Sequence, residues 1–452
     1  MDSQKIAKNP PPHAPSRPKH PMPATIAMIF GLLALYIPVT AADWPAWRGP
    51  HATGSVDSGN PPIHWSETEN VQWKVPVPGT SSSTPIIIGD RLVFQTAINL
   101  PGTEQGSTGG ESRRSMSRRP AGDYNFDLVC LDRHTGQTLW QTTVCKSLPH
   151  EGHHPDHGFA SFSPVTDGTH LWASFGSRGV YCLDLDGNLV WSREMPPMKM
   201  RAGFGEGSSP ALAGDALILV ADQEGDSFIY ALNKESGDIL WKRERDEQTS
   251  WSTPVVLNVN DRLQVVVNAT NFVRSYDVKT GEVVWQCSGQ TENVIPTPVP
   301  GDGMIYCTSG YRGSNLMAIR ADRTGDLSGT DAIAWQVDKD TPYVPSPLLH
   351  DGRIYVLSAN RGVVSCFRAS DGTPLFQRES LEGIRSVYAS PIGVQDRIYF
   401  AGREGAIVVL KAADKLEILA TNTLDDGFDA SPVVVGDQLY LKGKNSIYLI
   451  AH

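Results

Sequence analysis

The chain has 452 residues, of which 42 are glycine, 33 are proline and only 19% are charged. Frequent turn-forming residues between short apolar runs favour an all-β fold of short strands and tight turns over a helical one. The formal net charge of −10, with its one basic run (113–119) inside a Gly/Ser-rich stretch, argues against a nucleic acid as partner.

The N-terminal segment has the parts of a secretory signal peptide. Residues 1–23 are rich in Pro, Lys and His, an apolar run covers residues 24–39, and Thr40-Ala41-Ala42 supplies small residues for cleavage. The apolar run is shorter than the roughly 20 residues of a membrane-spanning helix. We expect residues 1–42 to be removed near Ala42 and the mature chain to be periplasmic or secreted. Membrane contact would then come only from the signal segment or from a membrane-protein partner.

One unit of about 44 residues repeats along the rest of the chain. Its copies open with Ser/Thr-Pro at Pro85, Pro164, Pro210, Pro254, Pro298, Pro347, Pro391 and Pro432. The clearest copy, Ser208 to Trp241, contains four strand-like runs. Its first run begins at Pro210, where a missing N–H is tolerated, and its fourth run is expected to end on Trp241 after a turn at Gly237. The other copies place a large apolar residue after the same turn, down to Ile418 in the seventh.

The last copy stops at Ile450, after its third strand. The missing fourth strand is found at the other end of the repeats, in Val71 to Val75. The sequence therefore predicts an eight-bladed β-propeller of four-stranded blades over residues 43–452, closed by pairing of the N- and C-terminal strands. WD40 blades have a similar period, but their Gly-His and Trp-Asp signatures are missing.

Six cysteines are present, without a CxxC or an adjacent pair. Cys130, Cys182 and Cys366 recur at one strand position where other copies place Ala231 or Ala318. We interpret these three as small buried core residues rather than as disulfide partners.

The segment from Tyr230-Ala231-Leu232-Asn233 through Gly237 to Leu240-Trp241, with its copies, resembles the pyrroloquinoline-quinone (PQQ) repeat of quinoprotein-like propellers. The opening Trp44-Pro45-Ala46-Trp47-Arg48-Gly49-Pro50 is similar to that of secreted bacterial PQQ-like propellers. The resemblance covers Asp43 to His452.

The resemblance implies two roles of different class. One is a non-catalytic, BamB-like interaction scaffold of the cell envelope, with an envelope protein as partner and a possible part in outer-membrane protein assembly. The other is a small dehydrogenase that uses PQQ and Ca²⁺, but the vicinal disulfide and long insertions of those enzymes are missing here. We favour the scaffold, which would not be an enzyme, and keep a metal- or glycan-binding module as a third alternative.

In such propellers, the loop before each first strand and the turn between the second and third strands lie on one face, around the channel. That face is the expected ligand site. The candidates on it are Arg178, Glu206, Glu224, Asp226, Trp251, Asn293, Arg312, Tyr343, Arg361, Arg385, Arg403 and Asp429. Converging guanidinium groups would suit a small anionic ligand, such as a quinone carboxylate or an acidic sugar, although each arginine could also form an interblade salt bridge. In a PQQ enzyme, Glu206, Asp226 or Asp429 could act as general base.

The loop from His150 to Gly158 places His150, His153, His154 and His157 close to two carboxylates. This composition suits Zn²⁺, with His153 or His154 and His157 as the expected ligand pair. The alternative is that these histidines bond to the backbone or face water. A Gly/Ser/Arg-rich insertion, residues 97–123, extends a turn of the first blade and has a composition that cannot bury a core of its own.

Overall fold

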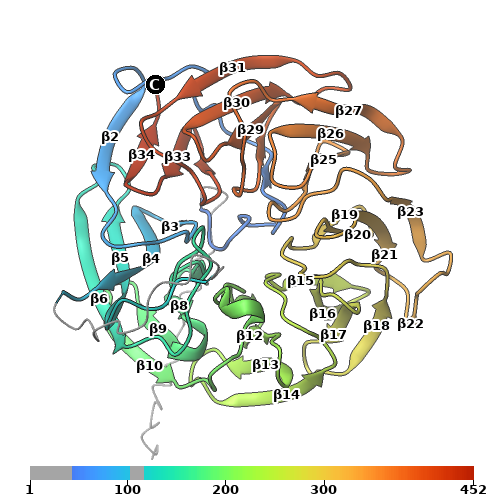
Figure 1. The fold of residues 1–452 in the computed structure, drawn as a ribbon, viewed down its shortest axis with the longest axis horizontal. Coiled ribbons are helices and arrows are strands. Elements are labelled where there is room, and N and C mark those ends of the chain that lie inside the picture. The colour runs from blue at the N-terminus through green and yellow to red at the C-terminus, as the bar shows by residue number, and fades with distance from the viewer. Residues whose placement is uncertain (1–42, 102–116) are drawn as a thin grey trace, which may run out of the picture. The chain divides into compact units, whose positions relative to one another are not determined.

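The computed structural model describes residues 43–101 and 117–452, which form eight blades around a central channel (Figure 1). The prediction of an all-β, eight-bladed propeller is confirmed. The expected signal peptide (1–42) and residues 102–116 of the predicted insertion lie outside the described residues. Within the described residues, no helix has the length and apolarity needed to cross a membrane.

The first four blades follow one another along the chain, and Figure 1 shows their fourth strands on the outer rim. Their strands are β3 (Ile86–Ile88), β4 (Arg91–Asn99), β5 (Tyr124–Asp132) and β6 (Thr138–Ser147), then β7 (Val165–Thr166), β8 (His170–Ser174), β9 (Val180–Asp184) and β10 (Leu189–Arg193), then β11 (Ala211–Ala213), β12 (Ala216–Ala221), β13 (Ser227–Asn233) and β14 (Ile239–Arg245), then β15 (Val255–Val259), β16 (Arg262–Val267), β17 (Val273–Asp277) and β18 (Val283–Cys287). Two short 3₁₀ helices, η1 (Gly176–Arg178) and η2 (Arg201–Gly203), lie in loops of this half.

The remaining blades repeat the pattern, with two additions. Their strands are β19 (Val299–Gly301), β20 (Met304–Ser309), β21 (Asn315–Arg320) and β23 (Ile333–Val337), then β24 (Leu348–His350), β25 (Arg353–Leu357), β26 (Val363–Arg368) and β27 (Pro374–Ser380), then β28 (Ile392–Val394), β29 (Arg397–Ala401), β30 (Ala406–Lys411) and β31 (Ile418–Thr423), then β32 (Val433–Val435), β33 (Gln438–Lys442) and β34 (Ser446–Ile450). The additions are β1 (Ser55–Val56), parallel to β28, and β22 (Gly325–Asp326), parallel to β18.

The eighth blade is completed by the N-terminal strand β2 (Val71–Pro76). Its strand order is β2-β34-β33-β32, and β2 runs antiparallel to β34 with Val71 opposite Ile450. The predicted closure of the ring by the two ends of the repeats is therefore confirmed. Closure leaves no blade with an unpaired third strand.

Every outermost strand carries the same β-bulge near its start. In β14, for example, Ile239 pairs with Leu232 and Trp241 with Ala231, so Leu240 is the extra residue. The residue after the bulge is Trp140, Trp191, Trp241, Trp285, Trp335, Phe376, Ala420 or Trp73 in the eight blades. Two expectations were wrong in detail: β14 continues past Trp241 to Arg245, and Ala420, not Ile418, has the equivalent position in the seventh blade.

The bulge turns the tryptophan toward the following blade. Trp191 donates its indole N–H to the carbonyl of Lys234 at 2.9 Å, and its ring lies against Gly237. The same indole-to-carbonyl bond joins Trp73 to Arg133, Trp140 to Leu185, Trp241 to Val278 and Trp335 to Ala369. These contacts couple neighbouring blades at the rim.

A second set of bonds couples the blades at the centre. The backbone N–H of each Ser or Thr before the repeat proline donates to the side-chain oxygen of the equivalent residue in the next blade, at 2.9 to 3.2 Å. The bonds run through Thr84, Ser163, Ser209, Thr253, Thr297, Ser346, Ser390 and Ser431 and return to Thr84. We call these eight residues the hydroxyl ring. It forms a closed circle that fixes the channel's inner wall.

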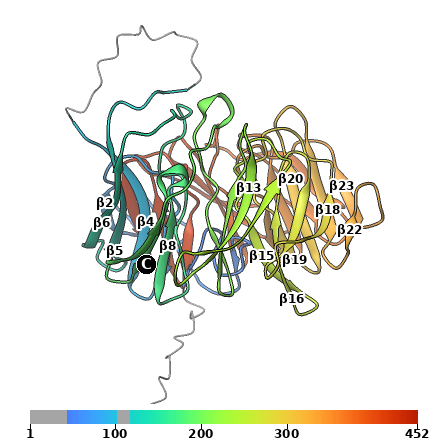
Figure 2. The ribbon, with the colours of Figure 1, turned by 90° about the horizontal axis from the view of Figure 1, so that it is seen from below.

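The segment before β2 crosses the face of the ring that carries the turns between first and second strands. Trp44 pairs with Ile87, and the carbonyl of Pro45 accepts from Thr166 N–H. Arg48, 1% exposed, donates to the carbonyls of Pro391 at 2.6 Å and of Pro347 at 3.0 Å. Figures 1 and 2 show this segment, in blue, at the centre of the ring and at one of its faces. The segment thus ties opposite sides of the propeller together.

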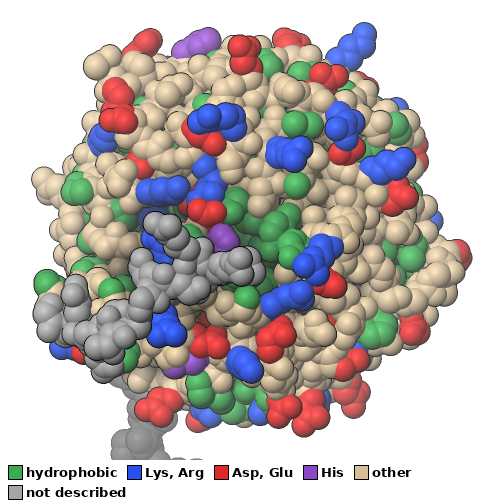
Figure 3. All heavy atoms as spheres, in the orientation of Figure 1, with side chains coloured by type: hydrophobic (Ala, Val, Ile, Leu, Met, Phe, Trp, Pro, Cys, Tyr) green, Lys and Arg blue, Asp and Glu red, His purple; other side chains and the backbone are tan. Residues whose placement is uncertain are grey.

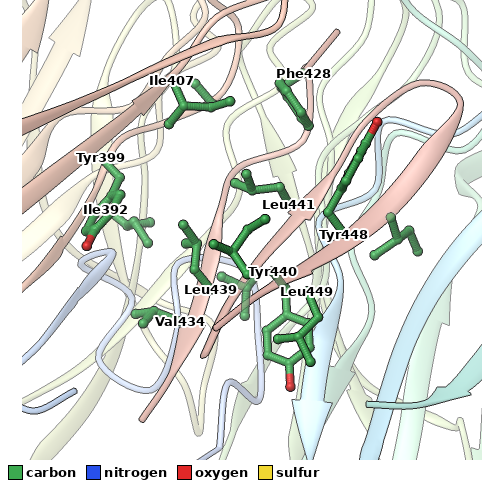
Figure 4. Packing of buried hydrophobic residues seen from close by; sticks show 14 of the residues in the cluster. Ile392, Tyr399, Ile407, Phe428, Val434, Leu439, Tyr440, Leu441, Tyr448 and Leu449 are labelled. Atoms are coloured by element: carbon green, nitrogen blue, oxygen red, sulfur yellow. The ribbon is translucent and has the colours of Figure 1, made fainter. Parts of the chain in front are cut away.

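The hydrophobic core is divided between neighbouring blades. Figure 4 shows the largest of its clusters, in which Tyr399 and Ile407 of the seventh blade lie near Leu441 and Tyr448 of the eighth. All six cysteines are free, and Cys130, Cys182 and Cys366 are buried in such clusters, as predicted.

Candidate functional site at the channel mouth

A cavity of about 380 Å³ opens at the end of the channel opposite the crossing segment. This volume is in the range of small-molecule sites in proteins. In Figure 3, which looks onto this face, hydrophobic side chains gather in the hollowed centre, and Lys, Arg, Asp and Glu surround it. The site is therefore a largely apolar cavity with a charged margin.

Aromatic side chains from several parts of the chain form much of the wall. They are Trp47, Phe204, Trp251, Tyr311, Tyr343 and Tyr388. Tyr311 and Tyr343 lie with ring centroids 5.0 Å apart and planes 31° apart, and Trp251 is held by a 2.7 Å bond from its indole N–H to the carbonyl of Gly205. Trp47 comes from the crossing segment and reaches the cavity from the opposite side. The hydrogen bond orients the indole of Trp251, and Tyr311 and Tyr343 pack against each other.

Six members of the hydroxyl ring also line the cavity: Thr84, Ser163, Ser209, Thr253, Ser390 and Ser431. Each side-chain oxygen accepts one backbone N–H from the neighbouring blade. Thr297 and Ser346, the other two members, make the same bonds but do not line the cavity. The six lining residues therefore each accept a backbone hydrogen bond between blades and also contact the cavity.

One cluster of charged groups stands at the margin. Arg403 bonds through Nε to Asp429 Oδ1 at 2.6 Å and through Nη2 to Asp156 Oδ1 at 3.1 Å, and its guanidinium lies 4.0 Å from the ring centre of Tyr388. The hydrogen bond from Arg403 lowers the pKa of Asp156. Burial raises the pKa of Tyr388 to about 12, so its phenol keeps the proton that it donates to Asp156. Lys444, 3.5 Å from Asp429, adds a second positive charge.

The side chains of Arg178 and Glu206 do not line this cavity but pair with each other between blades. Their ion pair measures 3.3 Å, with side chains only 7% and 4% exposed. Glu206 also accepts from the backbone N–H and the hydroxyl of Ser177, both at 2.7 Å. Both carboxylate oxygens thus have protein donors, which makes Glu206 part of the framework of this structure.

The other predicted residues are divided between the wall and the margin. Trp251, Tyr343 and Asp429 line the cavity, whereas Asn293 is buried and does not line it. Glu224, Asp226, Arg312, Arg361 and Arg385 are exposed. Glu224 accepts from Thr249, Arg312 lies 3.7 Å from Glu292, and Arg385 lies 4.0 Å from Glu404. The guanidinium groups do not converge on the cavity, and most of those named pair with carboxylates.

The histidine loop contributes His154 and His157 to the cavity wall. Both ring nitrogens of His157 are bonded: Nε2 donates to the carbonyl of Glu206 at 3.1 Å, and Nδ1 accepts from Ser161 at 2.7 Å. Burial lowers the pKa of His157 to about 4, so its ring is neutral. His150 bonds to the carbonyl of Met198 and His153 to that of His154. Among residues 43–101 and 117–452, no three His, Cys, Asp or Glu side chains are grouped to hold a metal ion, so the zinc site stays a prediction without a ligand set.

Sequence reasoning missed Trp47, Phe204, Tyr311 and the hydroxyl ring as cavity residues. Tyr311 immediately precedes Arg312, which was named as a candidate from the sequence. The Ser and Thr residues were recognised only as openings of strands, although they recur before every repeat proline.

Comparison with known proteins places the repeat in a family. Residues 125–378 match the sequence model of the PQQ_2 family, described as outer membrane protein assembly factor BamB. The chain belongs to this family. BamB of Yersinia pestis is 22% identical over 348 residues, which cover 72% of this chain and 79% of that protein.

Two solved structures align with most of this chain and have the same fold. BamB from Moraxella catarrhalis aligns with a TM-score of 0.56 and 13% identity, over 84% of this chain and 99% of that one. Quinohemoprotein alcohol dehydrogenase from Comamonas testosteroni aligns with a TM-score of 0.59 and 9% identity, over 90% of this chain and 80% of that one. At these identities the structural match concerns the fold alone.

Proposed function

We propose that the chain is an exported, BamB-like binding scaffold of the cell envelope and that it contributes to outer-membrane protein assembly. Membership of the PQQ_2 family supports this class of role, and the signal peptide expected at residues 1–42 would bring the chain to the periplasm. The observation that carries the proposal is a band of exposed apolar side chains on the outer rim.

This band, which we call the rim belt, consists of Leu139, Leu189, Val190, Ile239, Leu240 and Val283. Its side chains are 42% to 52% exposed and lie on β6, β10, β14 and β18, the outermost strands of four consecutive blades. Among the described residues, the other large apolar side chains with such exposure are Leu148, which follows β6, and Ile418 on β31. The exposed apolar surface is thus concentrated on one half of the circumference.

A belt of this kind is suited to a protein partner. Exposed apolar side chains that recur at one position of neighbouring blades suit a protein partner, because leaving them in water has a free-energy cost. Among the belt strands, β6, β10 and β14 are the last strands of their sheets, so each has one edge that no other strand of the sheet pairs with. In the fourth blade, β22 already uses such an edge by pairing with β18. We propose an envelope protein component of outer-membrane assembly as the partner.

The direct test is co-purification from detergent-solubilised envelopes. The double substitution Leu189→Asp/Ile239→Asp places charges in two neighbouring blades of the belt and should abolish recovery of the assembly component. Ile418→Asp is the matched control, because Ile418 is equally placed on its strand and 40% exposed, but lies in the seventh blade. Equal loss in both proteins, or recovery unchanged in the double variant, would contradict the proposal.

The dehydrogenase alternative needs a site for PQQ, which carries three carboxylates, and for Ca²⁺. The cations at the cavity margin, Arg403 and Lys444, already pair with Asp429. The described residues also contain no group of three carboxylate, His or Cys ligands for the metal. These residues do not fit the cofactor, and we propose no redox step. Stoichiometric PQQ binding with Ca²⁺-dependent dye reduction would replace the scaffold proposal by this alternative.

A further inference from the structure

We propose that the cavity at the channel mouth binds a neutral saccharide, with a pyranose ring against the aromatic wall and its oxygens bonded to the hydroxyl ring. The site is separate from the rim belt, so the proposal does not depend on the scaffold function. It rests on three features: unused hydrogen-bond donors, aromatic faces and balanced charge.

The donors belong to the six ring residues that line the cavity. Their exposed fractions range from 2% to 7%, so all are more than nine-tenths buried. Each oxygen accepts a backbone N–H, as in Ser346 N–H to Ser390 Oγ at 2.9 Å, but within the described residues none of these hydroxyl groups donates to a protein acceptor. A buried hydroxyl normally donates as well as accepts. Acceptor oxygens inside the cavity would satisfy these donors.

The aromatic wall supplies the complementary surface. A pyranose has apolar C–H faces and hydroxyl groups around its edge, so its binding sites pair flat rings with polar groups. Tyr311, Tyr343 and Trp251 line a cavity of about 380 Å³ with their aromatic side chains. A handful of placed polar groups in a mostly apolar pocket is the usual composition of a small-molecule site. This volume fits one or two sugar rings.

The charges at the margin select against a charged ligand. Asp156 and Asp429 are bridged by Arg403, and Lys444 contacts Asp429, so two carboxylates face two cations. A free carboxylate ligand would have to displace one of these partners, and a cationic ligand would compete with Arg403. The carboxylate oxygens still have lone pairs that can accept sugar hydroxyls. The pattern favours a neutral ligand rich in hydroxyl groups.

The test is binding of methyl glucoside, N-acetylglucosamine and cellobiose to the purified exported chain, by calorimetry and ligand-detected NMR. We expect saturable binding of at least one of these neutral probes and weaker binding of glucuronate and glucosamine. Ser390→Ala removes a hydroxyl from the cavity and should weaken binding roughly fivefold. Tyr343→Leu should weaken it by about the same factor or more.

Ser346→Ala is the matched control. It removes the acceptor of one ring bond, as Ser390→Ala does, but Ser346 does not line the cavity, so the affinity for sugar should stay unchanged. If a serine variant does not fold, Thr253→Val and Thr297→Val form an equivalent pair. Failure of all three neutral probes to bind, tighter binding of a charged probe, or equal weakening by both members of a pair would overturn the proposal.

Discussion

Single residues fix the packing of one blade on the next. In five blades the glycine after the third strand has a positive φ and lies against the tryptophan of the preceding blade: Gly136, Gly187, Gly237, Gly281 and Gly372. At Gly237 φ is +75°, and a Cβ atom would lie 2.6 Å from the Trp191 ring. The glycine is therefore required twice, once for its backbone conformation and once for the close contact.

The backbone requirement and the contact requirement can be separated by comparing two substitutions, Gly237→Ala and Gly303→Ala. Gly303 has nearly the same φ, +74°, but nothing lies within 4 Å of its added Cβ. We expect Gly303→Ala to cost about 1 kcal/mol through φ alone. Gly237→Ala should cost about 1–3 kcal/mol more, because the tryptophan must move. Urea unfolding of both variants measures the difference, and equal costs would show that Trp191 does not pack as described.

Lys442 is a buried cation with a measurable effect on stability. It is 1% exposed and donates to the carbonyl of Ser81 at 2.6 Å, and burial lowers its pKa from 10.5 to about 7, although Asp429 and Asp426 favour its charge. Between these values the unfolded chain holds a proton that the folded chain has released. Stability should therefore rise with pH from about 7 toward 10.5, by up to about 1.4 kcal/mol per pH unit.

Lys442→Met should remove this dependence. We compare the urea midpoints of the wild type and the variant at neutral and alkaline pH, because other groups titrate equally in both proteins. The wild type should gain stability relative to Lys442→Met as the pH rises. A constant difference between the two would mean that Lys442 stays charged in the folded protein across this range.

At the scale of elements, the hydroxyl ring and the bulged outer strands hold the blades together at two radii. Thr253→Val tests the ring, since it keeps the shape of the side chain but leaves the backbone N–H of Ser209 without its acceptor. We expect a loss of about 1–3 kcal/mol, the cost of a buried, unpaired donor. Thr253→Ser should retain most of the stability. Thermal or urea unfolding would contradict this role if Val and Ser behaved alike.

The sequence predicted the elements better than their contacts. Four strands per unit, the turn glycines and the closing strand follow from local patterns that repeat. The hydroxyl ring does not follow from local patterns. Its final bond joins Ser431 to Thr84 and exists only once the circle of blades is closed. The bulge near the start of the fourth strand was also missed. Trp241 was therefore expected at the end of that strand, whereas it lies near the start of β14.

At the scale of the whole molecule, the predicted site was only partly recovered. Trp251, Tyr343 and Asp429 lie in the cavity wall, because loop position alone brings them to the mouth. The partners of the charged residues come from distant blades, as in Arg403 with Asp156, and no local pattern shows such pairs. Arg178, Arg312, Arg385 and Arg403 thus have carboxylate partners in the fold.

The propeller as a whole presents two different surfaces: a cavity at the mouth and the rim belt around the first four blades. The rim belt extends over the outermost strands of four consecutive blades, which the hydroxyl ring joins at the centre. The central claim is that a protein partner binds to the outer rim of the first four blades and not to the rim of the other four.

The most direct measurement is a photo-crosslinking map of the rim in intact cells. A photo-reactive amino acid is placed in turn at positions 189, 239 and 283 in the belt and at the equivalent position 418 in the seventh blade. We predict one common adduct with an outer-membrane assembly component from the three belt positions and none from position 418. No adduct from the belt, or the same adduct from all four positions, would contradict the account.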